Sequence, residues 1–212
     1  MIRAVIFDCD GVLVDSEQLS NSVLAGLLTA AGLPTTLEHC LREYRGRSLT
    51  SVMELATQRH GAPLPDDIPA RYYAAVQERF AVEGEAIPGV IEALDAITLP
   101  VCVASSGPHH KMAVTLKRAG LLERFEGAIF SATEVRHGKP APDLFLHAAR
   151  TMGFDPASTA VVEDSVPGIV GARAAGMRAL AFARDTDADL LAKAGGEPFC
   201  DMAELPSLLN QQ

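Results

Sequence analysis

The chain has 212 residues, of which 48% are hydrophobic and 21% charged, so it can bury a core without disulfide or metal support. Its net charge of −9 argues against a protein that binds nucleic acid or anionic lipid through clustered positive charge. The sequence also contains no apolar run of about 18 residues, the length that a membrane span needs. From the charge and the missing span together, we expect neither nucleic acid nor membrane as a partner. Four scattered cysteines without a C-x-x-C motif favour a reduced, cytoplasmic compartment.

In chain order, the sequence predicts a series of short strands that alternate with helices. The strands are apolar runs without polar alternation, which is typical of a parallel sheet buried on both faces, and they are predicted at residues 3–7, 100–104, 127–130, 159–162 and 177–182. The helices between them are predicted at residues 90–97, 111–119, 142–152 and 168–175. This alternation indicates a doubly wound α/β fold with a parallel sheet.

The segment after the first strand interrupts this alternation. It contains helical patterns and no convincing strand, with helices predicted at residues 17–31, 37–44, 49–60 and 66–82. We therefore expect an all-helical domain at residues 16–85, inserted into a sheet domain made of residues 1–15 and 86–212. Residues 83–89, Glu-Gly-Glu-Ala-Ile-Pro-Gly, are expected to form the hinge between the domains.

Polar residues follow each of the three strongest predicted strands at its carboxyl end. They are, in chain order, Asp8 and Asp10, Ser105 and Ser106, and Glu163 and Asp164. Because ligands of an open α/β sheet bind beyond the carboxyl ends of its strands, we expect these residues to form one site. Carboxylates brought this close repel each other, and a hard divalent cation relieves the repulsion. An all-oxygen donor set favours Mg²⁺ over zinc.

Other residues near these strand ends are suited to binding a phosphate-sized anion. Ser105 offers a hydroxyl, and the amides of Ser106 and Gly107 open the next predicted helix, where N–H groups face anions. The serines could also cap that helix, and the two roles are compatible. Lys139 is one of only four lysines and is followed by proline. This favours a cation held in a fixed direction toward the anion over a surface charge that only aids solubility.

Taken in order, these motifs resemble those of the haloacid dehalogenase superfamily of phosphohydrolases. The matching motifs are Asp8-x-Asp10-Gly11-Val12, Ser105, Lys139 and Glu163-Asp164. The helical insert resembles the C1-type cap of this superfamily, so the resemblance implies a Rossmann-like core with an inserted cap. Residues 8–17 and 162–168 are similar to the subgroup that contains beta-phosphoglucomutase, and residues 106–112 resemble 6-phosphogluconate and sugar phosphatases.

The resemblance implies a Mg²⁺-dependent phosphatase of a small phosphomonoester, a sugar or sugar-acid phosphate such as 6-phosphogluconate. Asp8 would attack phosphorus and form an aspartyl-phosphate, while Asp10 would protonate the leaving oxygen and later deprotonate water. Ser105, the Ser106 amide and Lys139 would hold the phosphoryl group. Mg²⁺ would be held by Asp8, the main-chain carbonyl of Asp10, Asp164 and, directly or through water, Glu163.

Two further groups are candidates for substrate binding. His109 begins the helix after the serines and could contact the substrate phosphate, or it could be an exposed helix residue. Arg45, Gly46 and Arg47 lie where C1-capped relatives carry their substrate-specificity loop, and arginine suits an anionic or hydroxylated tail. A solvated helix end is the alternative for these three residues.

The main alternative function within the family is a phosphomutase that resembles beta-phosphoglucomutase. Such enzymes carry a histidine at the position of Ser20, an arginine at the position of Leu49 and a cap lysine, whereas residues 16–88 contain no lysine. These differences favour hydrolysis. A haloacid dehalogenase would lack Asp10, and a non-catalytic binding module would not need intact motifs. We expect a monomer, as is usual for C1-capped enzymes.

Overall fold

The computed structural model describes residues 1–44 and 49–210, so the predicted anion-binding residues Arg45, Gly46 and Arg47 lie outside the described residues. The chain divides into two units, one made of Met1–Val14 with Glu85–Gln212 and the other of Asp15–Gly84. Among the described residues, no helix combines the length and the hydropathy needed to cross a membrane.

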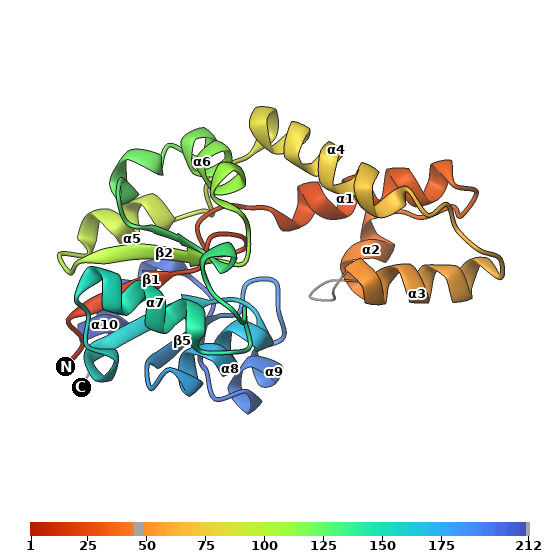
Figure 1. The fold of residues 1–212 in the computed structure, drawn as a ribbon. Helices are drawn as coiled ribbons and strands as arrows, with labels where there is room; N and C mark the ends of the chain where they lie inside the picture. The colour runs from red at the N-terminus through yellow and green to blue at the C-terminus, as the bar shows by residue number, and fades with distance from the viewer. Residues whose placement is uncertain (45–48, 211–212) are drawn as a thin grey trace. The chain divides into compact units, whose positions relative to one another are not determined.

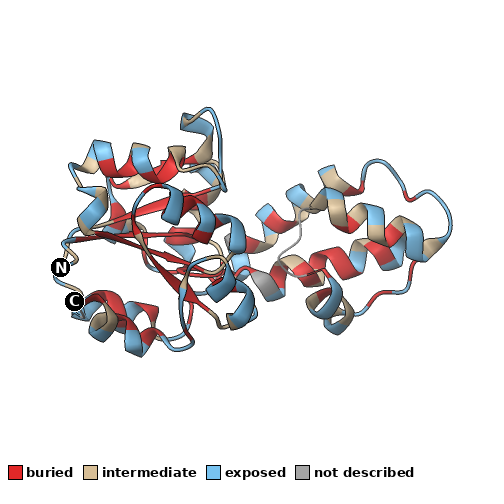
Figure 2. Ribbon diagram, turned by 90° about the horizontal axis from the view of Figure 1, so that it is seen from below, coloured by how far each residue is buried: buried red, intermediate tan, exposed pale blue. Residues whose placement is uncertain are grey.

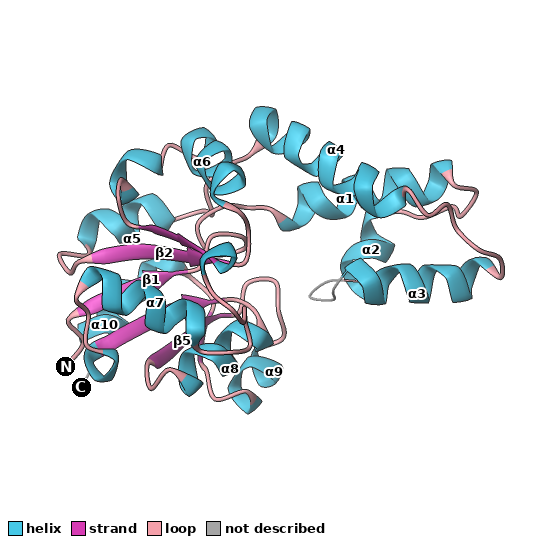
Figure 3. Ribbon diagram, viewed as in Figure 1, coloured by secondary structure: helices cyan, strands magenta, loops and turns pink. Residues whose placement is uncertain are grey.

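The larger unit is built around a six-stranded parallel sheet with the strand order β3-β2-β1-β4-β5-β6 (Figures 1 and 3). The strands are β1 (Ala4–Phe7), β2 (Val101–Ser105), β3 (Ile129–Ser131), β4 (Thr159–Glu163), β5 (Arg178–Phe182) and β6 (Glu197–Phe199). The central strand β1 pairs with both β2 and β4, and Ile6 stands opposite Cys102 and Val161. The prediction of a doubly wound parallel sheet is therefore confirmed.

Helices cover both faces of this sheet, and their sheet-facing residues are buried (Figure 2). They are α5 (Val90–Ala96), α6 (His109–Arg118), α7 (Asp143–Met152), α8 (Val166–Ala174), α9 (Ala188–Lys193) and α10 (Leu205–Asn210). Four short 3-10 helices add to them, namely η1 (Leu122–Phe125), η2 (Ala132–Glu134), η3 (Pro156–Ser158) and η4 (Met202–Glu204).

Alternation along β1 sends side chains to both faces of the sheet. Ile6 belongs to the apolar core with Phe145 of α7 and Ile169 of α8, whereas its neighbour Phe7 meets the ring of Phe125 edge-on. Strand β1 lies between β2 and β4. Its carboxyl end is therefore in the middle of the sheet, where the chain continues into Asp8.

The smaller unit consists, in its described part, of four helices. They are α1 (Glu17–Ala30), α2 (Leu37–Glu43), α3 (Leu49–His60) and α4 (Ile68–Glu83). Their shared core contains Leu28 of α1, Cys40 of α2, Ala56 of α3 and Ile68 of α4, all fully buried. The prediction of an all-helical insert after the first strand is confirmed, because each helical pattern buries an apolar face against the other three.

Candidate active site

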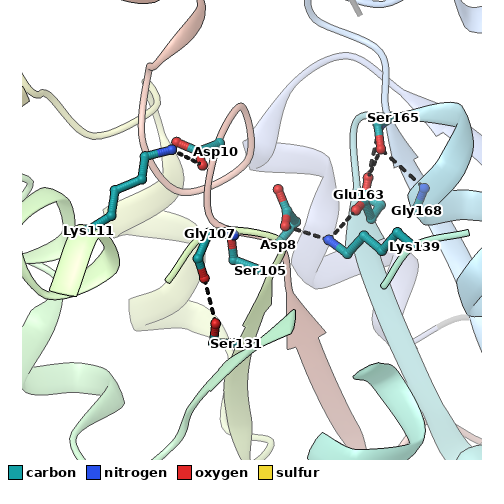
Figure 4. A network of polar contacts seen from close by, with 10 residues as sticks. All are labelled: Asp8, Asp10, Ser105, Gly107, Lys111, Ser131, Lys139, Glu163, Ser165 and Gly168. Atoms are coloured by element: carbon teal, nitrogen blue, oxygen red, sulfur yellow. Dashed lines mark hydrogen bonds and ion pairs between the residues drawn. The ribbon is translucent and has the colours of Figure 1, made fainter. Parts of the chain in front are cut away.

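A network of polar side chains lies at the carboxyl edge of the sheet (Figure 4). Asp8 follows β1, Ser105 ends β2, Ser131 ends β3 and Glu163 ends β4. Lys139 joins them from the loop that precedes α7. The parallel arrangement brings the ends of separate strands together, which is the reason that Asp8, Ser105 and Glu163 meet as the sequence predicts.

Lys139 forms a buried bridge between two carboxylates. Its Nζ lies 2.6 Å from Asp8 Oδ1 and 2.6 Å from Glu163 Oε1. The side chains of Lys139, Asp8 and Glu163 are only 5%, 9% and 1% exposed, and the ammonium stands 5.1 Å from the centre of the Phe145 ring. Charges removed from water to this extent require partners, and each carboxylate receives one from the single lysine.

The burial of Asp8 changes its acidity. Burial raises its pKa to about 7, an effect opposed by Lys139 and reinforced by the carboxylate of Glu163. Burial by itself would lower the pKa of Lys139, but the two carboxylates outweigh it and raise that pKa above its ordinary value. The lysine is therefore a permanent cation at neutral pH, directly beside the side chain that the sequence predicts to be the nucleophile.

Glu163 is engaged through both of its oxygens. While Oε1 accepts from Lys139, Oε2 accepts from the main-chain N–H of Ser165 at 2.9 Å and from its hydroxyl at 2.8 Å. Ser165 in turn accepts from the N–H of Gly168 and so caps α8. A Cβ at Gly168 would lie 1.9 Å from the Glu163 carboxyl carbon, so only glycine leaves room for this arrangement.

A second lysine contact was not predicted from the sequence. Lys111, in the first turn of α6, places Nζ 2.7 Å from Asp10 Oδ2 (Figure 4). The two side chains are 26% and 30% exposed, so this pair is more accessible than the pair around Lys139. The position of Lys111 at the start of the helix after the serines was the available signal, but sequence spacing does not reveal its partner.

The loop between β2 and α6 is held by hydrogen bonds within the protein. Gly107 donates its N–H to Ser105 Oγ at 3.1 Å, and Ser131 donates its hydroxyl to the Gly107 carbonyl at 2.8 Å. The Gly107 amide, which the sequence predicts to face an anion, is therefore bonded to Ser105 in this structure. Ser105 accepts this bond through oxygen and keeps its own hydroxyl proton for another acceptor.

A family model described as haloacid dehalogenase-like hydrolase matches residues 2–176, which include all of these residues. The chain belongs to this family. This hydrolase is 32% identical over 208 residues to 6-phosphogluconate phosphatase from Escherichia coli strain K12, covering 98% of this chain and 94% of that protein. It is 30% identical over 184 residues to hexitol phosphatase B from the same strain, covering 84% and 82% of the two chains.

Among solved structures, the hydrolase is similar to a conserved haloacid dehalogenase-like protein of unknown function from Agrobacterium tumefaciens strain C58. The TM-score is 0.92 at 35% sequence identity, and the match covers 99% of this chain and 98% of that one. The match extends over both the sheet and the helical insert, so the whole chain shares the architecture of this family.

The predicted metal ligands of the hydrolase do not form a side-chain cluster. Among the described residues, no group of three His, Cys, Asp or Glu side chains could by itself hold a metal ion. Lys139 contacts Asp8 and Glu163, and Lys111 contacts Asp10. The carboxylate of Asp164 nevertheless lies directly against the loop after β1, because a Cβ at Gly11 would approach its Oδ2 to 2.3 Å.

His109 of the hydrolase contacts a neighbouring carboxylate and is about half exposed. Its Nε2 lies 3.1 Å from Oε2 of Glu134, which also accepts from the main-chain N–H of Ser131 at 2.6 Å. This contact draws His109 toward η2, and the structure gives no contact between it and the network around Asp8. Of the two alternatives that the sequence leaves open, an exposed helix residue fits these contacts better.

Proposed function

We propose that this hydrolase is a phosphatase that removes the phosphoryl group of a small phosphomonoester by way of an aspartyl-phosphate on Asp8. The observation that carries the proposal is the buried bridge of Lys139 to Asp8 and Glu163, with 2.6 Å contacts on both sides. A fixed cation beside a carboxylate at the end of a central strand suits the attack of that carboxylate on a dianionic phosphate. It offsets the charge that would otherwise keep the two anions apart.

The reaction has two steps that share Asp8 and Asp10. In the first, an Asp8 oxygen bonds to phosphorus while the bond from phosphorus to the leaving oxygen breaks, and Asp10 gives that oxygen a proton. In the second, Asp10 takes a proton from water as the water oxygen bonds to phosphorus, and the bond to Asp8 breaks. Free phosphate leaves, and both aspartates return to their initial state. Ser105 and Lys139 hold the transferring group by donating hydrogen bonds.

The donor set at this edge of the sheet fits a hard cation. Asp8 and Asp164, with the main-chain carbonyl of Asp10, would hold Mg²⁺ through oxygen alone, which suits this ion. When bound, it would neutralise part of the charge on the phosphoryl oxygens. We propose that Glu163 is not one of its ligands, because Lys139 and Ser165 engage both carboxylate oxygens. Glu163 instead holds Lys139 in position.

The proposed substrate class is a sugar or sugar-acid phosphate. The similarity to a 6-phosphogluconate phosphatase over nearly the whole chain and to a hexitol phosphatase supports this class. The arginines at positions 45 and 47 would suit a carboxylated substrate such as 6-phosphogluconate. We propose 6-phosphogluconate as the first compound to test and a phosphorylated hexitol as the second.

A phosphate-release assay tests the proposal. We expect the purified protein to hydrolyse p-nitrophenyl phosphate and at least one sugar phosphate with Mg²⁺, and to lose this activity in EDTA. Asp8→Asn should abolish both reactions because the neutral amide is not a nucleophile, whereas Asp189→Asn, an exposed aspartate in α9, should leave them unchanged. Activity that persists in Asp8→Asn or in EDTA would contradict the proposal.

A second assay, which identifies the products, separates hydrolysis from mutase chemistry. The protein is incubated with beta-glucose 1-phosphate and a glucose bisphosphate activator, and the products are identified by phosphorus NMR. We expect inorganic phosphate as the phosphorus-containing product if this ester is accepted. Glucose 6-phosphate in its place would identify a mutase and overturn the choice of hydrolysis.

A further inference from the structure

The contact between Lys111 and Asp10 takes no direct part in the bond-making and bond-breaking steps of the proposed reaction. Lys111 Nζ donates to Asp10 Oδ2 at 2.7 Å, across 101 positions of sequence. Asp10 is the residue proposed to move the proton in both steps, so the geometry of its carboxyl group decides whether transfer can occur. A lysine fixed on this carboxyl group is therefore placed to act on the chemistry through Asp10.

The path of the Lys111 side chain is restricted. Its stem passes beside Gly107, where a Cβ would lie 3.4 Å from Lys111 Cδ, and Lys111 itself is mostly buried in the first turn of α6. Its Nζ and the Asp10 carboxylate form an ion pair at 2.7 Å. Lys111 thus links the first turn of α6 to the loop after β1 through a short charged contact.

The two oxygens of Asp10 are in different surroundings. An ammonium can donate but cannot accept, so Oδ2 serves as an acceptor toward Lys111. The other oxygen, Oδ1, is buried and has no hydrogen-bond partner among the described residues. Among the described residues, the hydrogen bond from Lys111 therefore holds the Asp10 carboxyl group through one of its two oxygens.

We propose that Lys111 is a positioning residue that fixes the carboxyl group of Asp10 through Oδ2. The inference rests on the proposed phosphatase function. In the first step the proton passes from Asp10 to the leaving oxygen as the bond from that oxygen to phosphorus breaks. In the second step Asp10 receives a proton from the attacking water as the water oxygen bonds to phosphorus and the bond to Asp8 breaks. Throughout both transfers, Lys111 keeps its own proton and its bond to Oδ2.

This role predicts a dependence on the leaving group. An alkyl phosphate releases a strongly basic oxygen that needs a proton from Asp10, whereas p-nitrophenyl phosphate releases a stable phenolate that does not. The quantity to compare is kcat/KM, which reports the steps up to the release of the alcohol or phenol. Loss of a residue that positions Asp10 should therefore lower kcat/KM for the alkyl ester and leave kcat/KM for the aryl ester nearly unchanged.

The test uses Lys111→Met, which removes the charge but keeps an unbranched side chain. Its kcat/KM should fall about 10²-fold for the best alkyl phosphate and less than about threefold for p-nitrophenyl phosphate, with the alkyl loss mainly in kcat. Lys111→Arg should recover most of the alkyl activity, because it restores a donor to Oδ2. The control is Lys117→Met, an exposed lysine of the same helix, which should behave as the wild type.

A double-mutant cycle shows whether Lys111 acts through Asp10. In an Asp10→Asn background, Lys111→Met should change kcat/KM for p-nitrophenyl phosphate and for the alkyl ester less than about threefold. Circular dichroism melting checks that each variant is folded, and Lys111→Gln replaces the methionine variant if that one is not.

Three outcomes would overturn the inference. An equal loss for both ester types in Lys111→Met, with a raised KM, would make Lys111 a direct ligand of the phosphoryl group. Full additivity with Asp10→Asn would show that the two residues act separately. A wild-type protein that hydrolyses neither ester would remove the proposed function itself, and the inference with it, whereas the first two outcomes leave that function intact.

Discussion

The active site contains two lysine–carboxylate contacts that differ in depth. Lys139 is almost fully buried and touches Asp8 and Glu163, whereas Lys111 is about a quarter exposed and touches Asp10. A buried cation between two buried anions is part of the fold as well as the chemistry, because removing it leaves charges without partners. A partly solvated pair contributes little to stability, so we expect Lys111 to matter for the geometry of Asp10 rather than for the fold.

The largest effect is expected at the buried contact. Lys139→Met should abolish measurable turnover and lower the free energy of unfolding by about 3–5 kcal/mol, because Asp8 and Glu163 would face each other without a cation. The free energy of unfolding is measured by urea titration in the presence of EDTA, with circular dichroism as the signal. The control is Lys193→Met, an exposed lysine in the last turn of α9. If the two variants were equally stable, the buried contact of Lys139 would contribute no more to the fold than an exposed lysine does.

The support of Glu163 should be the next most sensitive feature. Gly168→Ala places a methyl group 1.9 Å from the Glu163 carboxyl carbon, so the carboxylate must leave Lys139 or Ser165. We expect a loss of about 1–3 kcal/mol in stability and a reduced kcat. Gly26→Ala is the matched control, since its Cβ would meet nothing within 4 Å in α1, and this change should slightly stabilise the protein.

The outer contact should matter for catalysis much more than for stability. Lys111→Met should change the free energy of unfolding by less than about 1 kcal/mol, because both partners are partly solvated. The same urea titrations as for Lys139→Met provide the comparison. A destabilisation as large as that of Lys139→Met would show that the two lysines share one structural role.

The smallest effect is expected from salt. The chain carries a net charge of −9, so the attraction of a phosphate ester depends on the local cations rather than on the overall field. Raising sodium chloride from about 0.05 to about 0.3 M should raise KM less than about threefold, because contacts at short range are weakly screened. A steep rise measured in the phosphate-release assay would indicate long-range steering instead.

Most of the fold could be predicted from the sequence because the pattern is local. Short runs such as residues 159–162 are buried on both faces of the sheet. In the helices between them, apolar residues recur with the period of an α-helix. The elements that were missed are short and rely on packing. Strand β6 has two exposed residues, and Phe199 is held by the ring of Phe182 at 5.3 Å. Helices α9 and α10 contain six residues each, too few for a clear period.

By itself the sequence determined the family, the parallel sheet and the edge at which Asp8, Ser105 and Glu163 meet. Each strand carries its own polar residues to its own carboxyl end, so this outcome needs only local pattern and parallel pairing. Only the tertiary structure decided which partner each charge takes. Lys111 reaches Asp10 across 101 positions and Glu163 holds Lys139 across 24. Such pairings depend on where helices and loops direct side chains in space, and sequence spacing contains no measure of that direction.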